Sequence, residues 1–290
     1  MRQSLLIARR LRVAAALVLS APVAGAAPPA HKSDASADAY AELGRREAER
    51  IASGRSLVAV SVSVDIGSRH FKYSDSVGSG YAPYSQPVAP MLSFGVEAYP
   101  AAASGVPVLR DLGLRGRVSR GFGFDSNTPQ GASLETSWTR FGGELRERLI
   151  APGPHRLEVG LLAGMDANYF GITADRPVPA LLPAARTVAL RFGADGELLL
   201  AWRLSMLLGA AYLHVTSAGE IYDQFRDEHV AGFDGNLGFS IALGYGAEVR
   251  LMGRYTRYFA SFDPKLGDEH VAGGALDQLL QVGLGVRYAY

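Results

Sequence analysis

The fold is decided by a segment near the end of the sequence, which reads LQVGLGVRYAY from Leu280 to Tyr290. Apolar residues occupy every second position, and glycine or polar residues occupy most of the positions between them. Successive side chains of a β-strand point to opposite faces, so this pattern predicts a strand with one apolar and one small or polar face. The segment VAVSVSVDI, from Val58 to Ile66, shows the same period far away in the sequence.

Similar alternation recurs between these two segments, which predicts about ten strands in all, with eight or twelve as the alternatives. The expected strands cover residues 58–66, 92–98, 112–119, 133–148, 157–166, 188–193, 205–216, 237–245, 249–255 and 280–290. Most connections alternate between short and long, as do the periplasmic turns and outer loops of bacterial outer-membrane barrels. The connection over 100–109 breaks this rule, so it is either a periplasmic excursion or a sign that a neighbouring strand is misplaced.

The terminal segment resembles the last strand of bacterial outer-membrane β-barrel proteins, which alternates and ends on an aromatic residue. The resemblance implies an all-β transmembrane antiparallel up-and-down barrel of the small porin-like kind, without identifying a subfamily. It also implies that the barrel-assembly machinery and outer-membrane lipid are partners. The residues that would carry the assembly signal are Val282, Leu284, Val286, Tyr288 and Tyr290.

The first residues have the features of an export signal. A basic start is followed by a short apolar core and by the small residues Ala24-Gly25-Ala26, which predicts a signal peptide over 1–26. Residues 27–55 are expected to form a polar periplasmic segment, either a solvated tail or a short helix. Residues 56–290 would then form the barrel, located in the bacterial outer membrane with both termini in the periplasm.

Composition excludes several other classes of protein. The chain has 290 residues, no cysteine and a formal net charge of +1. It therefore has no disulfide, thiol nucleophile or Cys-ligated zinc, and it lacks the basic footprint of a nucleic-acid-binding protein. No apolar run reaches the roughly 18 residues that a membrane-spanning helix requires. No cofactor is expected.

Charged residues on the small or polar face are expected to point into the lumen. Because both signs occur and about ten strands make a narrow barrel, these charges are expected to pair and largely occlude the lumen. The expected lumen charges are Arg115, Arg117, Glu158, Asp166, Arg191, Glu248, Arg250, Arg254, Asp277 and Arg287. Aromatic residues near segment ends are expected to form interfacial girdles. These aromatic residues are Tyr99, Trp138, Tyr169, Trp202, Tyr212, Tyr245, Tyr255, Tyr258 and Tyr288.

One hexapeptide occurs twice. Asp-Glu-His-Val-Ala-Gly begins at Asp227 and again at Asp268, and each copy stands at the end of a long expected loop. If the loops converge, carboxylates and imidazoles could hold a divalent cation. The simpler interpretation is that a strand-pair unit was duplicated and that the charges of both copies face water. The candidate metal ligands are Asp227, Glu228, His229, Asp268, Glu269 and His270.

Three kinds of function remain. The preferred one is a non-catalytic outer-membrane barrel that is structural, porin-like or a surface-interaction component. The first alternative is an outer-membrane hydrolase with an acid–His site on the extracellular rim. His214 and Thr216 with Glu220 resemble the His-x-Ser pair of outer-membrane lipid deacylases, although threonine departs from that pattern. The second alternative is a barrel subunit of a larger envelope complex.

Overall fold

The computed structural model describes residues 56–77, 83–102, 104, 106–127, 133–151, 156–173, 184–201, 203–265, 267–268 and 271–290. The expected signal peptide, the polar segment over 27–55 and Trp202 lie outside the described residues. No described helix is long and apolar enough to cross a bilayer.

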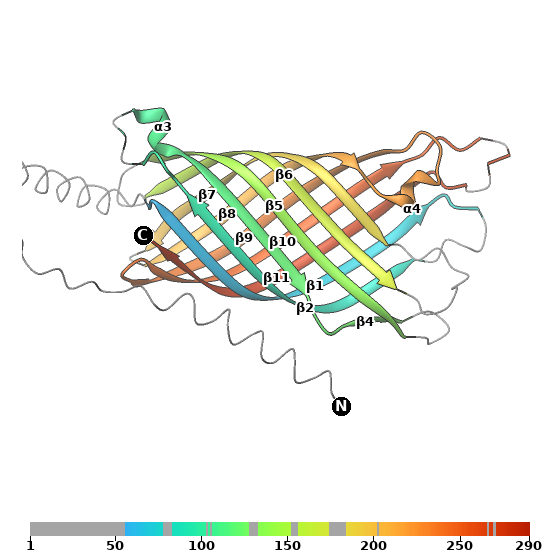
Figure 1. Ribbon diagram of the computed structural model, residues 1–290, viewed down its shortest axis with the longest axis horizontal. Helices are drawn as coiled ribbons and strands as arrows, with labels where there is room; N and C mark the ends of the chain where they lie inside the picture. Colours follow the sequence, from blue (N-terminus) through green and yellow to red (C-terminus); the bar gives the residue numbers. More distant parts are fainter. Residues whose placement is uncertain are drawn as a thin grey trace, which may run out of the picture. The chain divides into compact units, whose positions relative to one another are not determined.

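The described residues form an all-β closed barrel of ten antiparallel strands with one short extra strand, as the sequence predicts (Figure 1). The strands are β1 (Val58–Ser74), β2 (Tyr84–Ala98), β3 (Leu112–Gly121), β4 (Asp125–Asn127), β5 (Ser133–Ala151), β6 (Leu157–Thr173), β7 (Ala185–Ala201), β8 (Leu204–Ser217), β9 (His229–Gly244), β10 (Ala247–Ser261) and β11 (Gly274–Ala289). The ten long strands pair in chain order, with β3 paired directly to β5, and β1 pairs with β11 to close the barrel. The short strand β4 pairs with β5 alone.

The extra strand β4 continues the line of β3 along β5. Arg120 of β3 lies opposite Thr139, and Asp125 of β4 lies opposite Glu135, so β3 and β4 are separated by one more residue than the facing part of β5. Such an extra residue is a bulge, which bends a strand and re-aims its side chains. Here it turns Phe124 into the barrel interior.

Several strands extend further than expected; β2, for example, begins at Tyr84 rather than at residue 92, and β7 ends at Ala201 rather than at residue 193. The irregular connection over 100–109 leads into the short helix α3 (Pro107–Asp111), and the strand ends that flank it, Ala98 and Leu112, agree with the expected ones. The long connection between β8 and β9 contains a second short helix, α4 (Glu220–Asp223). The shortest described turn joins β9 to β10 through Tyr245 and Gly246, whose φ angles of 52° and 80° suit a type I′ hairpin.

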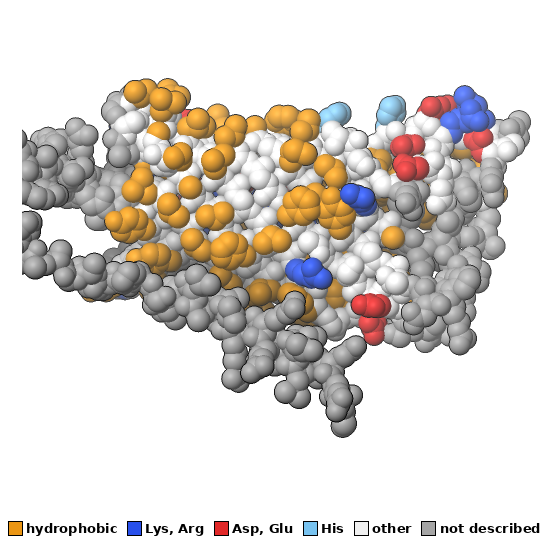
Figure 2. All heavy atoms as spheres, in the orientation of Figure 1, with side chains coloured by type: hydrophobic (Ala, Val, Ile, Leu, Met, Phe, Trp, Pro, Cys, Tyr) orange, Lys and Arg blue, Asp and Glu red, His pale blue; other side chains and the backbone are white. Residues whose placement is uncertain are grey.

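Apolar side chains form a belt around the outside of the barrel. Strand β1 exposes Val58 to Ile66 at alternate positions, and β11 together with Tyr290 after it exposes the five expected assembly-signal residues on the same wall. Figure 2 shows this belt over the part of the barrel near the C-terminus, with charged and histidine side chains gathered towards the loops. In water an apolar surface of this size would be unfavourable, whereas in lipid it is the outer face that a membrane barrel needs.

The expected aromatic girdle is wrong at three positions. Tyr99, Trp138 and Tyr258 point into the barrel and are buried. Their place in the alternation decides their side: Trp138 is even-numbered on β5, whose outward residues include Phe141 and Leu145. The outward aromatic residues include Tyr212, Tyr245 and Tyr288.

Candidate functional site

The lumen holds the ten charges that the sequence places there. Seven of them line a single cavity, and the other three, Asp166, Glu248 and Asp277, form ion pairs with inward-facing arginines. The cavity has a volume of about 310 Å³ and lies in the half of the barrel nearer the short turns. Its wall also includes uncharged polar residues such as Ser63, Asn236 and Gln281.

One layer of ion pairs lies close to the short turns, centred on Arg146. Its guanidinium donates to Asp195 at 2.7 Å, to Glu158 at 2.7 Å and to Glu97 at 3.2 Å. Arg115 donates to Asp195 at 2.6 Å, which links β3 to the layer as well. One guanidinium can donate five hydrogen bonds in fixed directions, so Arg146 holds side chains from β2, β6 and β7 in place.

A second layer lies deeper in the barrel. Asp166 accepts from Arg117 at 2.6 Å and from Arg254 at 3.0 Å. Asp234 accepts from Arg254 and Arg191, both at 2.7 Å, so Arg254 of β10 bridges Asp234 of β9 and Asp166 of the distant strand β6. The two carboxylates are almost fully buried, and removing such a group from water is unfavourable unless arginines of this kind surround it.

Several residues of these layers were not anticipated from the sequence. Arg140, Glu144 and Arg146 alternate on β5 with outward apolar residues, so their inward direction could have been predicted. Asp195 lies in the part of β7 beyond the expected strand end at residue 193. Asp234 lies in β9 ahead of the expected strand start at residue 237. The underestimated lengths of β7 and β9 therefore account for Asp195 and Asp234 only.

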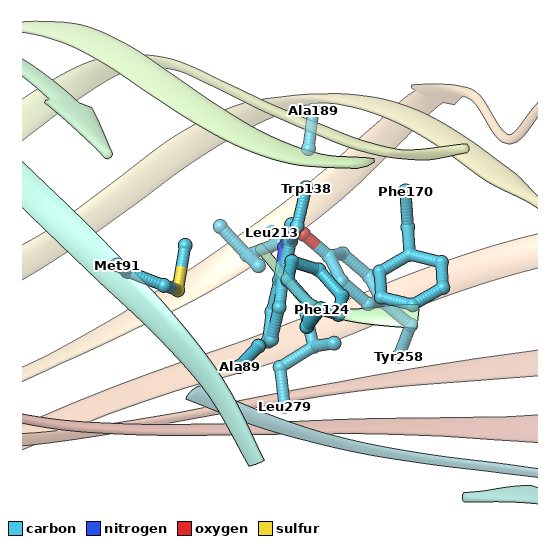
Figure 3. Packing of buried hydrophobic residues seen from close by; sticks show 9 residues of the cluster. All are labelled: Ala89, Met91, Phe124, Trp138, Phe170, Ala189, Leu213, Tyr258 and Leu279. Atoms are coloured by element: carbon cyan, nitrogen blue, oxygen red, sulfur yellow. The ribbon is translucent and has the colours of Figure 1, made fainter. Parts of the chain in front are cut away.

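Beyond the second layer, towards the loops, apolar side chains fill the lumen. We call this cluster the aromatic plug: Ala89, Met91, Phe124, Trp138, Phe170, Ala189, Leu213, Tyr258 and Leu279. Its members come from strands all around the barrel, and Figure 3 shows them converging on Trp138. Trp138 is 0% exposed and packs edge-on against Phe170, with ring centroids 5.6 Å apart. Its indole N–H donates to Asn168 at 2.8 Å, so the buried polar atom of the ring is satisfied.

One ion pair is embedded beside the plug. Arg69 and Asp277 have side chains that are 0% and 1% exposed, and they share three contacts between 2.8 and 3.2 Å. The Arg69 guanidinium also lies 4.4 Å from the centre of the Phe170 ring, where a cation–π attraction is favourable. Charge and aromatic packing therefore occupy the same cross-section of the barrel.

A second apolar cluster, which we call the loop-side cluster, lies between the plug and the loops. Phe225, just after α4, stacks on Phe262 with ring centroids 4.1 Å apart, and Tyr222 of α4 packs against Phe71. Burial raises the pKa of the Tyr222 phenol well above its ordinary value, so this group stays neutral. The segment between β8 and β9 thus folds inward over the lumen.

The two copies of the hexapeptide have different surroundings. Asp227 has a φ of 51° and His229 begins β9 with an exposed side chain, whereas Glu269 and His270 lie outside the described residues. Asp268 accepts from the Lys265 backbone N–H at 2.8 Å and from Arg226 at 3.2 Å. Among the described residues, no three metal-binding side chains come together. The cation site therefore stays a prediction.

The apolar halves of the two copies have a shared role. Val230 of the first copy packs against both apolar clusters, and Ala272 of the second is a fully buried member of the loop-side cluster. Both copies therefore contribute to the apolar packing at the loop end of the lumen. The other rim candidates are exposed: His214 faces outward on β8, and the Thr216 hydroxyl donates to the Val188 carbonyl at 3.2 Å.

A closed antiparallel barrel with an apolar outer belt and a charged interior is the architecture of bacterial outer-membrane β-barrel proteins. No protein-family model matches the sequence, and no curated protein matches it. Among solved structures, the outer-membrane protease OmpT from Escherichia coli is 8% identical and aligns over 80% of this chain and 96% of its own, with a TM-score of 0.46.

Two further solved structures have the same kind of fold. Neisserial surface protein A is 12% identical over 80% of this chain and 99% of its own, with a TM-score of 0.32. An outer-membrane channel from Pseudomonas putida F1 is 10% identical over 81% of this chain and 96% of its own, with a TM-score of 0.40. These three structures are a protease, a surface protein and a channel, so sequence identities of 8 to 12% assign no activity to this chain.

Proposed function

We propose that the protein is a non-catalytic bacterial outer-membrane barrel with a closed lumen, acting as a structural or surface-interaction component of the envelope. The aromatic plug is the observation that carries this proposal, because it fills the barrel cross-section with side chains from strands on all sides. A barrel of about eight strands is just filled by side chains and one of about 16 leaves a channel, so ten strands suit a filled interior.

The orientation follows from the loops. The end with the short turns would face the periplasm, which puts both termini of the barrel there, and the end with α4 would face outward. The cavity of about 310 Å³ would then lie on the periplasmic side of the plug. The barrel-assembly machinery would insert the chain by its last strand.

Reconstitution tests this proposal directly. In vesicles, the wild-type barrel is expected to admit no disaccharide in a swelling assay and to give no steady single-channel current in a planar bilayer, while a general porin serves as the positive control. A Trp138→Ala/Phe170→Ala variant is expected to pass small ions, because both side chains lie in the plug. The outer-wall variant Phe141→Ala/Phe192→Ala removes similar apolar bulk and is expected to stay closed.

Rapid uptake of a disaccharide by the wild type would overturn the proposal and identify a general porin. A plug variant that remains as closed as the wild type would show that other segments seal the lumen. Folding of every variant is checked by the shift in gel mobility on heating, which distinguishes an open barrel from an unfolded one.

A further inference from the structure

The arginines on the outer wall differ from those in the lumen. Inside, arginines such as Arg146, Arg191 and Arg254 each contact at least two carboxylates. Outside, Arg120 on β3 and Arg186 on β7 are exposed, and no carboxylate of the described residues lies within ion-pair distance of either. Because Arg120 and Arg186 lack, among the described residues, the carboxylate partners that the interior arginines have, their charges are available to an external anion.

The two outward arginines belong to one row across four strands. Arg120 lies opposite Thr139 of β5, Thr139 lies opposite Tyr169 of β6, and Tyr169 lies opposite Arg186 of β7. Neighbouring strands are about 4.8 Å apart, so roughly 14 Å of sheet separates the two arginine backbones. Both guanidiniums, on their long side chains, can therefore reach one headgroup that carries two phosphates.

Aromatic contacts hold part of this row in place. The Arg186 guanidinium lies 5.2 Å from the centre of the Tyr169 ring. The Tyr169 ring is itself supported by Phe141, whose ring stacks on it with centroids 5.5 Å apart and an interplanar angle of 18°. A guanidinium packed against a ring loses less side-chain entropy on binding a phosphate than a freely moving one. Glu135 is the nearest outward acid on β5, and it lies four residues further towards the loops.

The row stands at the loop-side border of the apolar belt. Below it, towards the short turns, β3 exposes Val118 and Leu114, β5 exposes Leu145, and β6 exposes Met165 and Leu161. A basic and aromatic row directly above an apolar wall matches the two halves of a phosphorylated lipid, since acyl chains cover the wall and phosphates meet the cations. In Figure 2, basic side chains stand on the barrel wall just beyond the orange belt.

We propose that Arg120, Thr139, Tyr169 and Arg186 bind the phosphorylated headgroup of an outer-leaflet glycolipid, with its acyl chains along β3, β5 and β6. This inference rests on the proposed outer-membrane location. The acyl chains distinguish the lipid from free phosphate, because the row continues directly into the belt. The two guanidiniums supply charge-assisted hydrogen bonds to phosphate oxygens, and Thr139 and Tyr169 supply hydroxyl donors between them.

The test measures binding of diphosphoryl lipid A to the full barrel in a non-ionic detergent. Wild-type barrel is expected to bind it, and the Arg120→Gln/Arg186→Gln variant is expected to bind at least tenfold more weakly. The matched control is Lys72→Gln/Arg257→Gln, which removes the same charge from β1 and β10, and its affinity is expected to change less than twofold. Dephosphorylated lipid A is expected to bind the wild type as weakly as the double arginine variant binds the intact lipid.

Three outcomes would overturn the assignment: equal losses in both double variants, equal binding of the dephosphorylated lipid, or full competition by millimolar inorganic phosphate. The first would indicate a general surface charge effect, the second an apolar association, and the third a free-phosphate site. Heat-dependent gel mobility and the closed-lumen measurements are made on the same preparations. Failure of the lipid site therefore leaves a folded, closed barrel, whereas failure of the proposed function does not.

Discussion

Breaking the buried ion pair beside the aromatic plug is the most sensitive test of how dry the lumen is. Asp277→Asn removes the carboxylate that contacts Arg69 at 2.8 to 3.2 Å, while leaving the side-chain volume almost unchanged. With charge centres about 4 Å apart and an effective dielectric constant of about 20, the lost attraction is about 4 kcal/mol. This agrees with the loss of about 3–5 kcal/mol found when one partner of a buried pair is removed.

The matched double variant separates attraction from packing. Arg69→Met/Asp277→Leu removes both charges together and fills the space with apolar groups, which in buried pairs is often neutral or stabilising. We therefore expect Asp277→Asn and Arg69→Met each to lower the free energy of unfolding by about 3–5 kcal/mol. We expect the double variant to stay within about 1 kcal/mol of the wild type.

The assay is urea unfolding in lipid vesicles followed by Trp138 fluorescence in a Trp202→Phe background, since the chain has two tryptophans. Trp138 is fully buried in the plug, so its emission reports the loss of packing there. A cost below about 1 kcal/mol for Asp277→Asn would mean that water screens the pair. A double variant as unstable as the singles would also refute the reasoning, because the pair would then act through shape.

Three further results are expected. Deleting Tyr288–Tyr290 should lower the amount of heat-modifiable barrel in the outer membrane, because the backbone of these residues pairs with the start of β1; unchanged levels would contradict a role in assembly. Gly246→Ala should destabilise the barrel more than Gly244→Ala in the same urea assay, since both have positive φ but only the Gly246 Cβ would overlap the β11 backbone. Asp268→Asn should lower the protection factor of the Lys265 amide against hydrogen exchange at pH 7. The Lys265 N–H and Arg226 lower the Asp268 pKa, so the wild-type protection factor should fall only as the pH drops below the ordinary value of about 3.9, and a protection factor that stays constant at lower pH would refute this.

Much of the barrel follows from local alternation, because the side of each strand residue depends only on its parity. Val282, Val286 and the other apolar residues of the same strand face outward as expected, and Arg115 and Arg191 face inward. Trp138 shows that the same rule also holds where composition misleads, since nearness to a segment end suggested a girdle and parity puts it inside.

What parity does not give is convergence across the lumen. Arg254 of β10 and Asp166 of β6 are 88 residues apart in sequence, and their contact depends on the number of strands and on the stagger between them. The inward fold of α4 over the plug is equally remote from local pattern, because Phe225 meets Phe262 from a different loop. The expected paired charges could be named as a set, but their partners required the closed barrel.

The seam between β1 and β11 has a consequence for the order of folding. It pairs Ala59 with Ala289, whereas a hairpin such as β9–β10 pairs residues separated by a two-residue turn. The free-energy cost of closing a loop, which is entropic, grows as about (3/2)RT ln n. It is about 5 kcal/mol for a loop of about 230 residues and about 1 kcal/mol for one of about four. Hairpins can therefore form one by one along the chain, while the seam becomes favourable only after the intervening strands have already shortened the distance between its edges. Until then both edges of the sheet remain open, so the first and the last strand are together the last elements to gain their full set of hydrogen bonds.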